Sequence, residues 1–160
     1  MKKLFVVMCM VLVSATSFAQ KTDKGDMSIG AHFGYIIDSP HNLGAGVNIG
    51  YMFMDHVRGV GEFNYFFKKD YASYWNVEAN VEYLFHVGDS FTVYPLVGLD
   101  LLGQRYDDGS FSNTDTKLGL NLGVGVEYPI ASMLSLKAEF NYKTEANGYS
   151  LLKAGIVIPF

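Results

Sequence analysis

The sequence contains little cysteine and little charge, and each shortage excludes a class of protein. Its one cysteine, Cys9, lies in the N-terminal apolar stretch, so neither a disulfide framework nor a thiolate zinc site can form. Only 18% of the residues are charged and the net charge is −4, which argues against a nucleic-acid partner. His32, His56 and His86 are dispersed and show no metal-ligand spacing, so we expect no cofactor and no metal. Aromatic residues make up 15% of the chain, which argues against disorder.

The first 19 residues have the three parts of a secretory signal peptide. Two lysines precede ten apolar residues (4–13), and small residues then stand at the −3 and −1 positions of a cleavage site between Ala19 and Gln20. We predict a signal peptide at 1–19 and one domain at 20–160; an N-terminal anchor helix is the alternative. After this segment no run of about 18 apolar residues occurs, so we expect no transmembrane helix.

The rest of the chain alternates between apolar and polar residues with a period of two, which is typical of strands with one apolar face. The pattern occurs in eight segments: 27–35, 43–53, 57–67, 75–85, 91–101, 118–128, 134–142 and 152–160. Short turns alternate with four longer polar loops, at 37–42, 68–73, 103–115 and 144–149. The sequence therefore predicts an all-β fold, an eight-stranded antiparallel up-and-down β-barrel.

Alternation alone allows a soluble, lipocalin-like barrel with an apolar lining or a transmembrane β-barrel with an apolar outer face. The polar face is rich in glycine and in charges of both signs, which suits the tight interior of a narrow barrel. Aromatic residues mark both ends of the apolar face, as at the two membrane–water interfaces. We predict a transmembrane barrel whose aromatic girdle comprises Tyr35, Phe67, Trp75 and Tyr142 near the long loops and Phe53, Phe85, Phe91 and Tyr128 near the short turns.

The cleavage site, the eight strands and the terminal run 155–160 together resemble the small outer-membrane β-barrels of Gram-negative bacteria, of the OmpA and OmpX type. The resemblance covers nearly all of residues 25–160. It implies a location in the cell outer membrane, contact with lipid and lipopolysaccharide, and insertion by the outer-membrane assembly machinery, which reads the last strand. Phe160 would end that assembly signal. We expect a monomer.

An eight-stranded barrel has a lumen just wide enough for side chains to fill it. Ten charged residues on the polar face are predicted to form an ion-pair network there: Arg58, Glu62, Glu78, Glu82, Asp100, Lys117, Glu127, Lys137, Glu139 and Lys153. Centring the hairpins on their loops places Arg58 opposite Glu82, Glu62 opposite Glu78, and Glu139 opposite Lys153. An acidic arc of Glu62, Glu78 and Asp100 then needs Arg58 and the lysines across the lumen to neutralise it.

A filled lumen predicts a structural or interaction role, in envelope integrity, adhesion or partner binding. A small gated, porin-like channel along the acidic arc is the alternative, and Glu78→Gln or Glu62→Gln would then change its conductance. A lipid A-modifying enzyme is the third candidate, because Asp38, Ser39 and His41 share the first long loop. Such residues also form ordinary turns, so we expect no catalytic residue.

Overall fold

The computed structural model describes residues 23–38, 41–69, 72–88, 90–107, 112–145 and 147–160. The predicted signal peptide and its cleavage site at Ala19 and Gln20 lie outside the described residues, as does Ser39. In the described part of the chain, no helix is long and apolar enough to cross a membrane.

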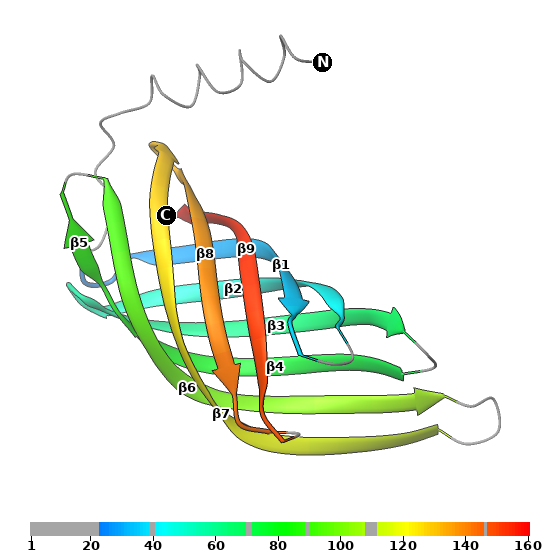
Figure 1. The fold of residues 1–160 in the computed structure, drawn as a ribbon. Coiled ribbons are helices and arrows are strands. Elements are labelled where there is room, and N and C mark those ends of the chain that lie inside the picture. Colours follow the sequence, from blue (N-terminus) through cyan, green and yellow to red (C-terminus); the bar gives the residue numbers. More distant parts are fainter. Residues whose placement is uncertain (1–22, 39–40, 70–71, 89, 108–111, 146) are drawn as a thin grey trace, which may run out of the picture.

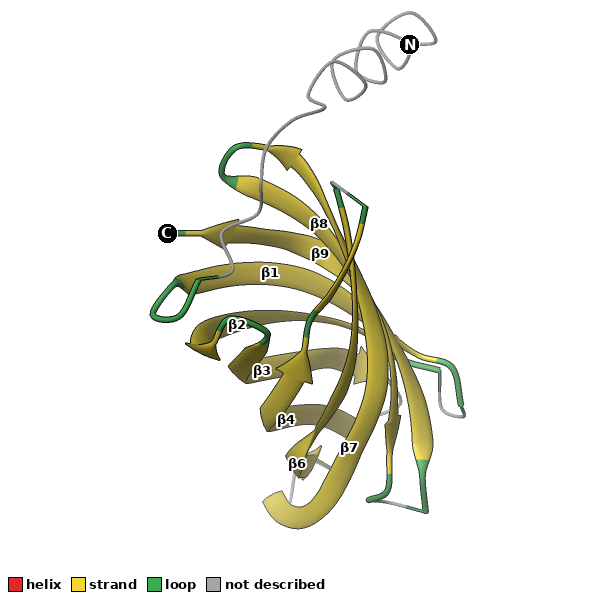
Figure 2. Ribbon diagram, turned by 90° about the vertical axis from the view of Figure 1, so that its left-hand side faces the viewer, coloured by secondary structure: helices red, strands yellow, loops and turns green. Residues whose placement is uncertain are grey.

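Nine strands make up the described structure: β1 (Met27–Ile36), β2 (Leu43–Met54), β3 (Val57–Lys69), β4 (Ala72–Tyr83), β5 (Phe85–Val87), β6 (Phe91–Asp107), β7 (Ser112–Ala131), β8 (Leu134–Lys143) and β9 (Tyr149–Pro159). β5 continues β4 after Leu84, and both pair with β6, so together they count as one strand of the barrel. The Leu84 backbone N–H donates to the carbonyl of His56 (2.8 Å). β1 pairs with β9 and β4 pairs with β6, so the sheet closes. The predicted eight-stranded antiparallel barrel is confirmed (Figures 1 and 2).

The apolar face of the strands points outward and the polar face points inward. Outward residues such as Leu118, Leu120 and Val124 are exposed, whereas Glu127 and Asn121 are completely buried. This arrangement is the reverse of that in a soluble protein. It is what a barrel needs when hydrocarbon surrounds it and its lumen is closed. The three predicted cross-strand pairs are present: Arg58 with Glu82, Glu62 with Glu78, and Glu139 with Lys153.

Two apolar clusters lie inside the barrel, where the sequence predicts only polar and charged side chains. The upper apolar cluster, toward the long loops, consists of Ile36, Phe66, Leu102, Tyr149 and Leu151. The lower apolar cluster, toward the short turns, consists of Met52, Leu84, Tyr94 and Leu96. The charged residues occupy the space between these two clusters and around the lower one.

Two of the predicted long loops are mostly strand. β6 and β7 remain paired as far as Asp107 and Ser112, so most of the predicted loop 103–115 belongs to a hairpin. β3 and β4 likewise continue into the predicted loop 68–73. Figure 1 shows β6 and β7 running well past β8 and β9. The alternation of apolar and polar residues ends where no hydrocarbon faces the sheet, but backbone pairing between the strands continues. The sequence pattern therefore ends these strands too early.

Candidate functional site: the charged interior

Nine of the ten predicted lumen residues are buried inside the barrel: Arg58, Glu62, Glu78, Glu82, Asp100, Glu127, Lys137, Glu139 and Lys153. The prediction is wrong for Lys117, whose side chain is 51% exposed and lies 4.0 Å from Asp115. The physical reason is the length of β7. Lys117 precedes Asn121, the residue at which pairing with β8 ends, so its side chain lies beyond the closed part of the barrel.

Arg58 organises the lower charged layer, which we define as Arg58, Glu82, Glu127, Lys137 and Glu139. Its Nε donates to Oε2 of Glu82 (2.7 Å), and its Nη1 and Nη2 both donate to the carboxylate of Glu127. Lys137 Nζ lies 3.1 Å from Glu82 and 2.7 Å from Glu139. Every carboxylate of this layer therefore contacts at least one cation, as burial of a charge requires.

Tyr94 packs against both cations of the lower charged layer. Its ring centroid lies 5.5 Å from Arg58 Cζ and 5.2 Å from Lys137 Nζ, which are cation–π distances. Its hydroxyl donates to Glu139 Oε1 (3.0 Å). Gly125, on the neighbouring strand, leaves the room for this ring, because a Cβ there would overlap it. Tyr94 thus joins the lower apolar cluster to the ion pairs.

Lys153 connects the lower charged layer to the acidic residues above it. Its Nζ lies 2.5 Å from Glu62, 3.0 Å from Glu139 and 3.4 Å from Glu78. His32 Nε2 also approaches Glu62 at 3.5 Å and lies 2.5 Å from Asn64 Oδ1. One ammonium group therefore serves three carboxylates.

Glu78 is the most highly coordinated carboxylate of the interior. Four buried asparagine amides donate to it, from Asn64, Asn76, Asn80 and Asn121, at 2.9–3.1 Å. Lys143 Nζ forms an ion pair with Glu78 and lies 3.3 Å from Asp100. The predicted acidic arc is thus neutralised by two lysines. The expectation that Arg58 does this is wrong, because Arg58 is occupied by Glu82 and Glu127.

Sequence reasoning missed two interior residues, Lys143 and Glu145. Lys143 is completely buried and has the same strand parity as Asn141, but the alternation ends one residue before it. Glu145 lies after β8 and is only 5% exposed. Extending the parity of β8 by one residue would have predicted that Lys143 faces inward. Glu145 lies beyond any alternating segment, so no sequence pattern predicts its position. We define the upper charged layer as Glu78, Asp100, Lys143 and Glu145.

The predicted girdle residues lie on the outer wall toward the two ends of the strands. Seven of them are exposed: Tyr35, Phe53, Phe67, Phe85, Phe91, Tyr128 and Tyr142. Trp75 is half-buried, because its indole covers Gly103 on the neighbouring strand, where a Cβ would overlap it. Aromatic rings also meet along the wall, with Tyr83 and Phe85 at 4.8 Å between centroids.

The residues considered for catalysis have other contacts. The carboxylate of Asp38 accepts a hydrogen bond from the backbone N–H of Ser150 (2.5 Å), and the His41 ring stacks on Tyr35. His56 and His86 come from separate segments, and their ring centroids lie 5.8 Å apart. Among the described residues, no group of three histidine, cysteine or acidic side chains could hold a metal.

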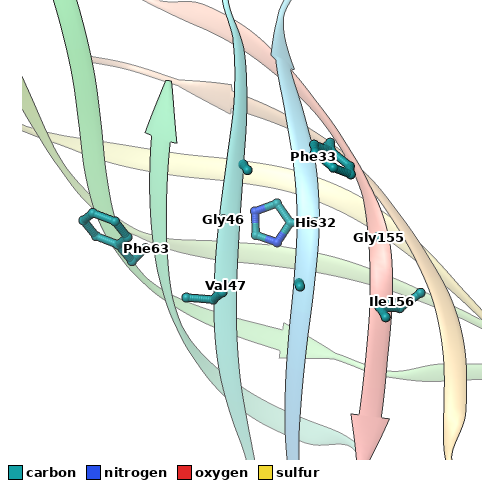
Figure 3. A pocket seen from close by; sticks show the side chains of 9 residues that line it. His32, Phe33, Gly46, Val47, Phe63, Gly155 and Ile156 are labelled. Carbon is teal, nitrogen blue, oxygen red and sulfur yellow. The ribbon is translucent and has the colours of Figure 1, made fainter. Parts of the chain in front are cut away.

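An open hollow of about 590 Å³ lies on the outer wall where β9, β1, β2 and β3 adjoin (Figure 3). Its outward lining is apolar and includes Ala31, Phe33, Val47, Phe63 and Ile156. The small side chain of Ala31 lies between larger neighbours on the adjacent strands, which produces the hollow. The lining also includes His32, which is the titratable residue of the set and is buried.

Known proteins share this arrangement of strands. The chain matches the model of the family described as "Outer membrane protein beta-barrel domain" over residues 5–156. It belongs to this family. It is an outer-membrane β-barrel protein, and its closed antiparallel sheet with an apolar exterior agrees with that membership.

Solved structures of the same fold share little sequence with it. The N-terminal β-barrel domain of Pseudomonas aeruginosa OprF has a TM-score of 0.73 and 17% identity, covering 86% of this chain and 98% of that chain. Neisserial surface protein A has a TM-score of 0.70 and 20% identity, covering 84% and 96%. Ail, the attachment invasion locus protein of Yersinia pestis, has a TM-score of 0.62 and 15% identity, covering 86% and 99%. No curated protein matches the sequence.

Proposed function

We propose that this barrel has a structural or interaction role in the outer membrane and that its lumen is filled. The observation that carries the proposal is the arrangement of the interior, in which paired charges fill the space between the two apolar clusters. Such packing stabilises a scaffold. The scaffold in turn presents the long hairpin of β6 and β7 on its long-loop side, where envelope components or a partner can contact it.

The room left inside the barrel supports a filled lumen. One internal hollow, beside Lys153, Glu62 and Glu139, measures about 10 Å³, which is about the room that a single water needs. A second hollow of about 10 Å³ lies beside Arg58 and Met52. An ion that crossed this barrel would have to displace buried ion pairs, so we favour the scaffold over the channel.

The proposal includes the route of the chain to the outer membrane. Residues 1–19 direct export and are removed between Ala19 and Gln20, and the assembly machinery then reads the last strand. At the seam of the barrel, Phe160 N–H donates to the Met27 carbonyl (2.8 Å) and Met27 N–H donates to the Phe160 carbonyl (3.2 Å). A residue that follows β9 and closes the sheet against β1 suits an assembly signal. The barrel then stands as a monomer among lipid and lipopolysaccharide.

The test compares cells that lack the protein with cells that produce it. We expect the deletion to weaken the envelope, measured as leakage of periplasmic enzyme and sensitivity to detergent, or to reduce attachment to surfaces. The wild-type chain should restore the deficit. A deletion that leaves the envelope and attachment intact but slows the uptake of small solutes contradicts the proposal and favours a channel. A change in lipid A mass in the deletion strain would instead favour an enzyme.

A further inference from the structure

Two of the four histidines of the chain lie side by side at the short-turn end of the barrel. His56 is the last residue of the turn between β2 and β3, and His86 lies in β5. Their ring centroids are 5.8 Å apart, and the ring planes are tilted by 51°. Figure 1 shows β5 beside this turn, so side chains from two different hairpins meet here.

The backbone holds His56 next to the strand that carries His86. The carbonyl of His56 accepts a hydrogen bond from the Leu84 N–H (2.8 Å), and Leu84 joins β4 to β5. The next residue, Val57, is the register partner of Tyr83 on β4. The His56 ring also stacks on the Tyr83 ring, with 6.1 Å between the centroids. The closeness of the two imidazoles therefore follows from strand pairing.

A hydrogen bond inside the sheet orients the ring of His86. Its Nδ1 lies 3.0 Å from Oγ1 of Thr92, which is the register partner of His86 on β6 and is buried. When Nδ1–H donates to this oxygen, the lone pair of the ring lies on Nε2. Histidines that bind metals are commonly held in this way, through a hydrogen bond from the nitrogen that does not bind the ion.

The distance between the rings fits one shared metal ion. A bond of about 2.0–2.1 Å from each imidazole nitrogen to one ion places the two ring centroids about 5–6 Å apart. The observed separation of 5.8 Å lies in this range. Both histidines are exposed, so an ion and its waters can reach them. The described residues offer no group of three ligating side chains, so two imidazoles are the contribution of the protein.

We propose that His56 and His86 bind one late first-row divalent metal ion, of the class of Zn²⁺, Ni²⁺ and Cu²⁺, and that water completes its coordination. Imidazole suits these ions, whereas Mg²⁺ and Ca²⁺ take oxygen ligands. The short turns of an outer-membrane barrel face the periplasm, so the ion enters from that side. Once bound, it ties the β2–β3 turn to β5.

This site differs from the expectation, drawn from the sequence, that the chain holds no metal. That expectation rests on spacing along the chain, and spacing does not reveal residues that become neighbours only when strands pair. The other two histidines lie elsewhere. His32 is buried and lies 2.5 Å from Asn64 Oδ1, and His41 stacks on Tyr35 at the long-loop end.

Calorimetric titration of the untagged mature protein in detergent micelles with zinc chloride tests the proposal. We expect one ion per barrel, and an excess of Mg²⁺ should not compete with it. Thr92→Val removes the oxygen that orients His86 and should weaken binding about tenfold. His56→Gln and His86→Gln each remove a ligand and should weaken binding further. His41→Gln is the matched control and should bind zinc as the wild type does.

A second measurement uses the wild-type chain alone and so does not depend on the folding of any variant. Paramagnetic Ni²⁺ should broaden the amide resonances of residues 55–57 and 85–87 and leave those of residues 41–43 sharp. Absence of saturable zinc binding to the wild type would overturn the proposal. So would binding that is unchanged in both His56→Gln and His86→Gln, or broadening by Ni²⁺ that spares both segments.

Discussion

The two charged layers of the barrel interior contain the same kinds of side chain but balance their charges differently. In the lower charged layer every carboxylate contacts a cation, and Arg58 alone serves both Glu82 and Glu127. In the upper charged layer Lys143 serves Glu78 and Asp100, while Glu145 has no cation among the described residues. The same barrel thus holds one layer saturated by ion pairs and one layer with a carboxyl group in excess.

The difference shows two ways of burying charge in a narrow lumen. A saturated layer serves as a rigid core, since removal of either partner leaves an uncompensated charge. In a layer with an excess carboxyl group, that group lacks an ion-pair partner among the described residues. The first arrangement lies toward the short turns, and the second lies nearer the long loops.

The largest effect is expected from breaking the saturated layer. Arg58→Met removes the cation that contacts both Glu82 and Glu127, so the free energy of unfolding should fall by about 3–5 kcal/mol. Reversible urea unfolding in lipid vesicles measures the change. The matched control is Lys117→Met, which removes an exposed cation and should change stability by less than about 0.5 kcal/mol. Equal effects of the two variants would show that the interior ion pairs do not stabilise the barrel.

A smaller loss is expected from opening the apolar cluster above the charges. Leu151→Ala leaves a cavity among Ile36, Phe66 and Tyr149, and should cost about 2–4 kcal/mol in the same unfolding measurement. Met133→Ala, at an exposed turn residue, serves as the control and should cost little. If both substitutions are tolerated equally, the upper apolar cluster is not a packed plug.

Amide substitutions sharpen the comparison between the layers. Glu82→Gln removes a charge that accepts hydrogen bonds from Arg58 and Lys137, and should cost about 1.5–3 kcal/mol. Asp100→Asn should cost less, because one cation, Lys143, contacts Asp100 and no donor among the described residues makes a hydrogen bond to its oxygens. Urea unfolding at neutral pH compares the two. The distinction between the layers fails if Asp100→Asn costs as much as Glu82→Gln.

The smallest effect concerns one hydrogen bond of the lower charged layer. Tyr94→Phe keeps the ring between Arg58 and Lys137 but removes the donor to Glu139, and should cost about 1 kcal/mol. The midpoint of urea unfolding should shift without a change in slope. No shift would mean that Lys137 and Lys153 already satisfy Glu139.

Much of the fold could be predicted from the sequence because hydrocarbon imposes a strict rule on the outer face. Every strand that meets lipid must alternate, so parity alone places Leu120 outside and Asn121 inside. Register follows from the hairpins, and for that reason the pair of Arg58 and Glu82 could be predicted from the position of the loop between their strands. Phe66 and Leu151 also have the parity of inward-facing residues. Because both are apolar, the apolar–polar alternation did not reveal that they form a cluster inside the barrel.

The rest depends on contacts that no local pattern records. The β6–β7 hairpin continues past the lipid through backbone pairing, which is why Lys117 is exposed. Glu145 enters the lumen only because Thr144 extends the pairing and Gly119 lacks a side chain. The cations that neutralise the acidic arc are likewise the lysines that reach across the closed barrel, and no local pattern predicts which these are. One of them, Lys143, also lies just past the alternating segment.

The most direct test of the filled lumen is the electrical current through single molecules of the mature protein in a planar lipid bilayer. Insertion must be verified by protease protection, and a known porin in the same membrane confirms that steps would be seen. The packed charges between the two apolar clusters predict no conductance steps. Discrete steps in the wild type that change in Glu78→Gln or Glu62→Gln would contradict a closed interior and make the acidic arc an ion path.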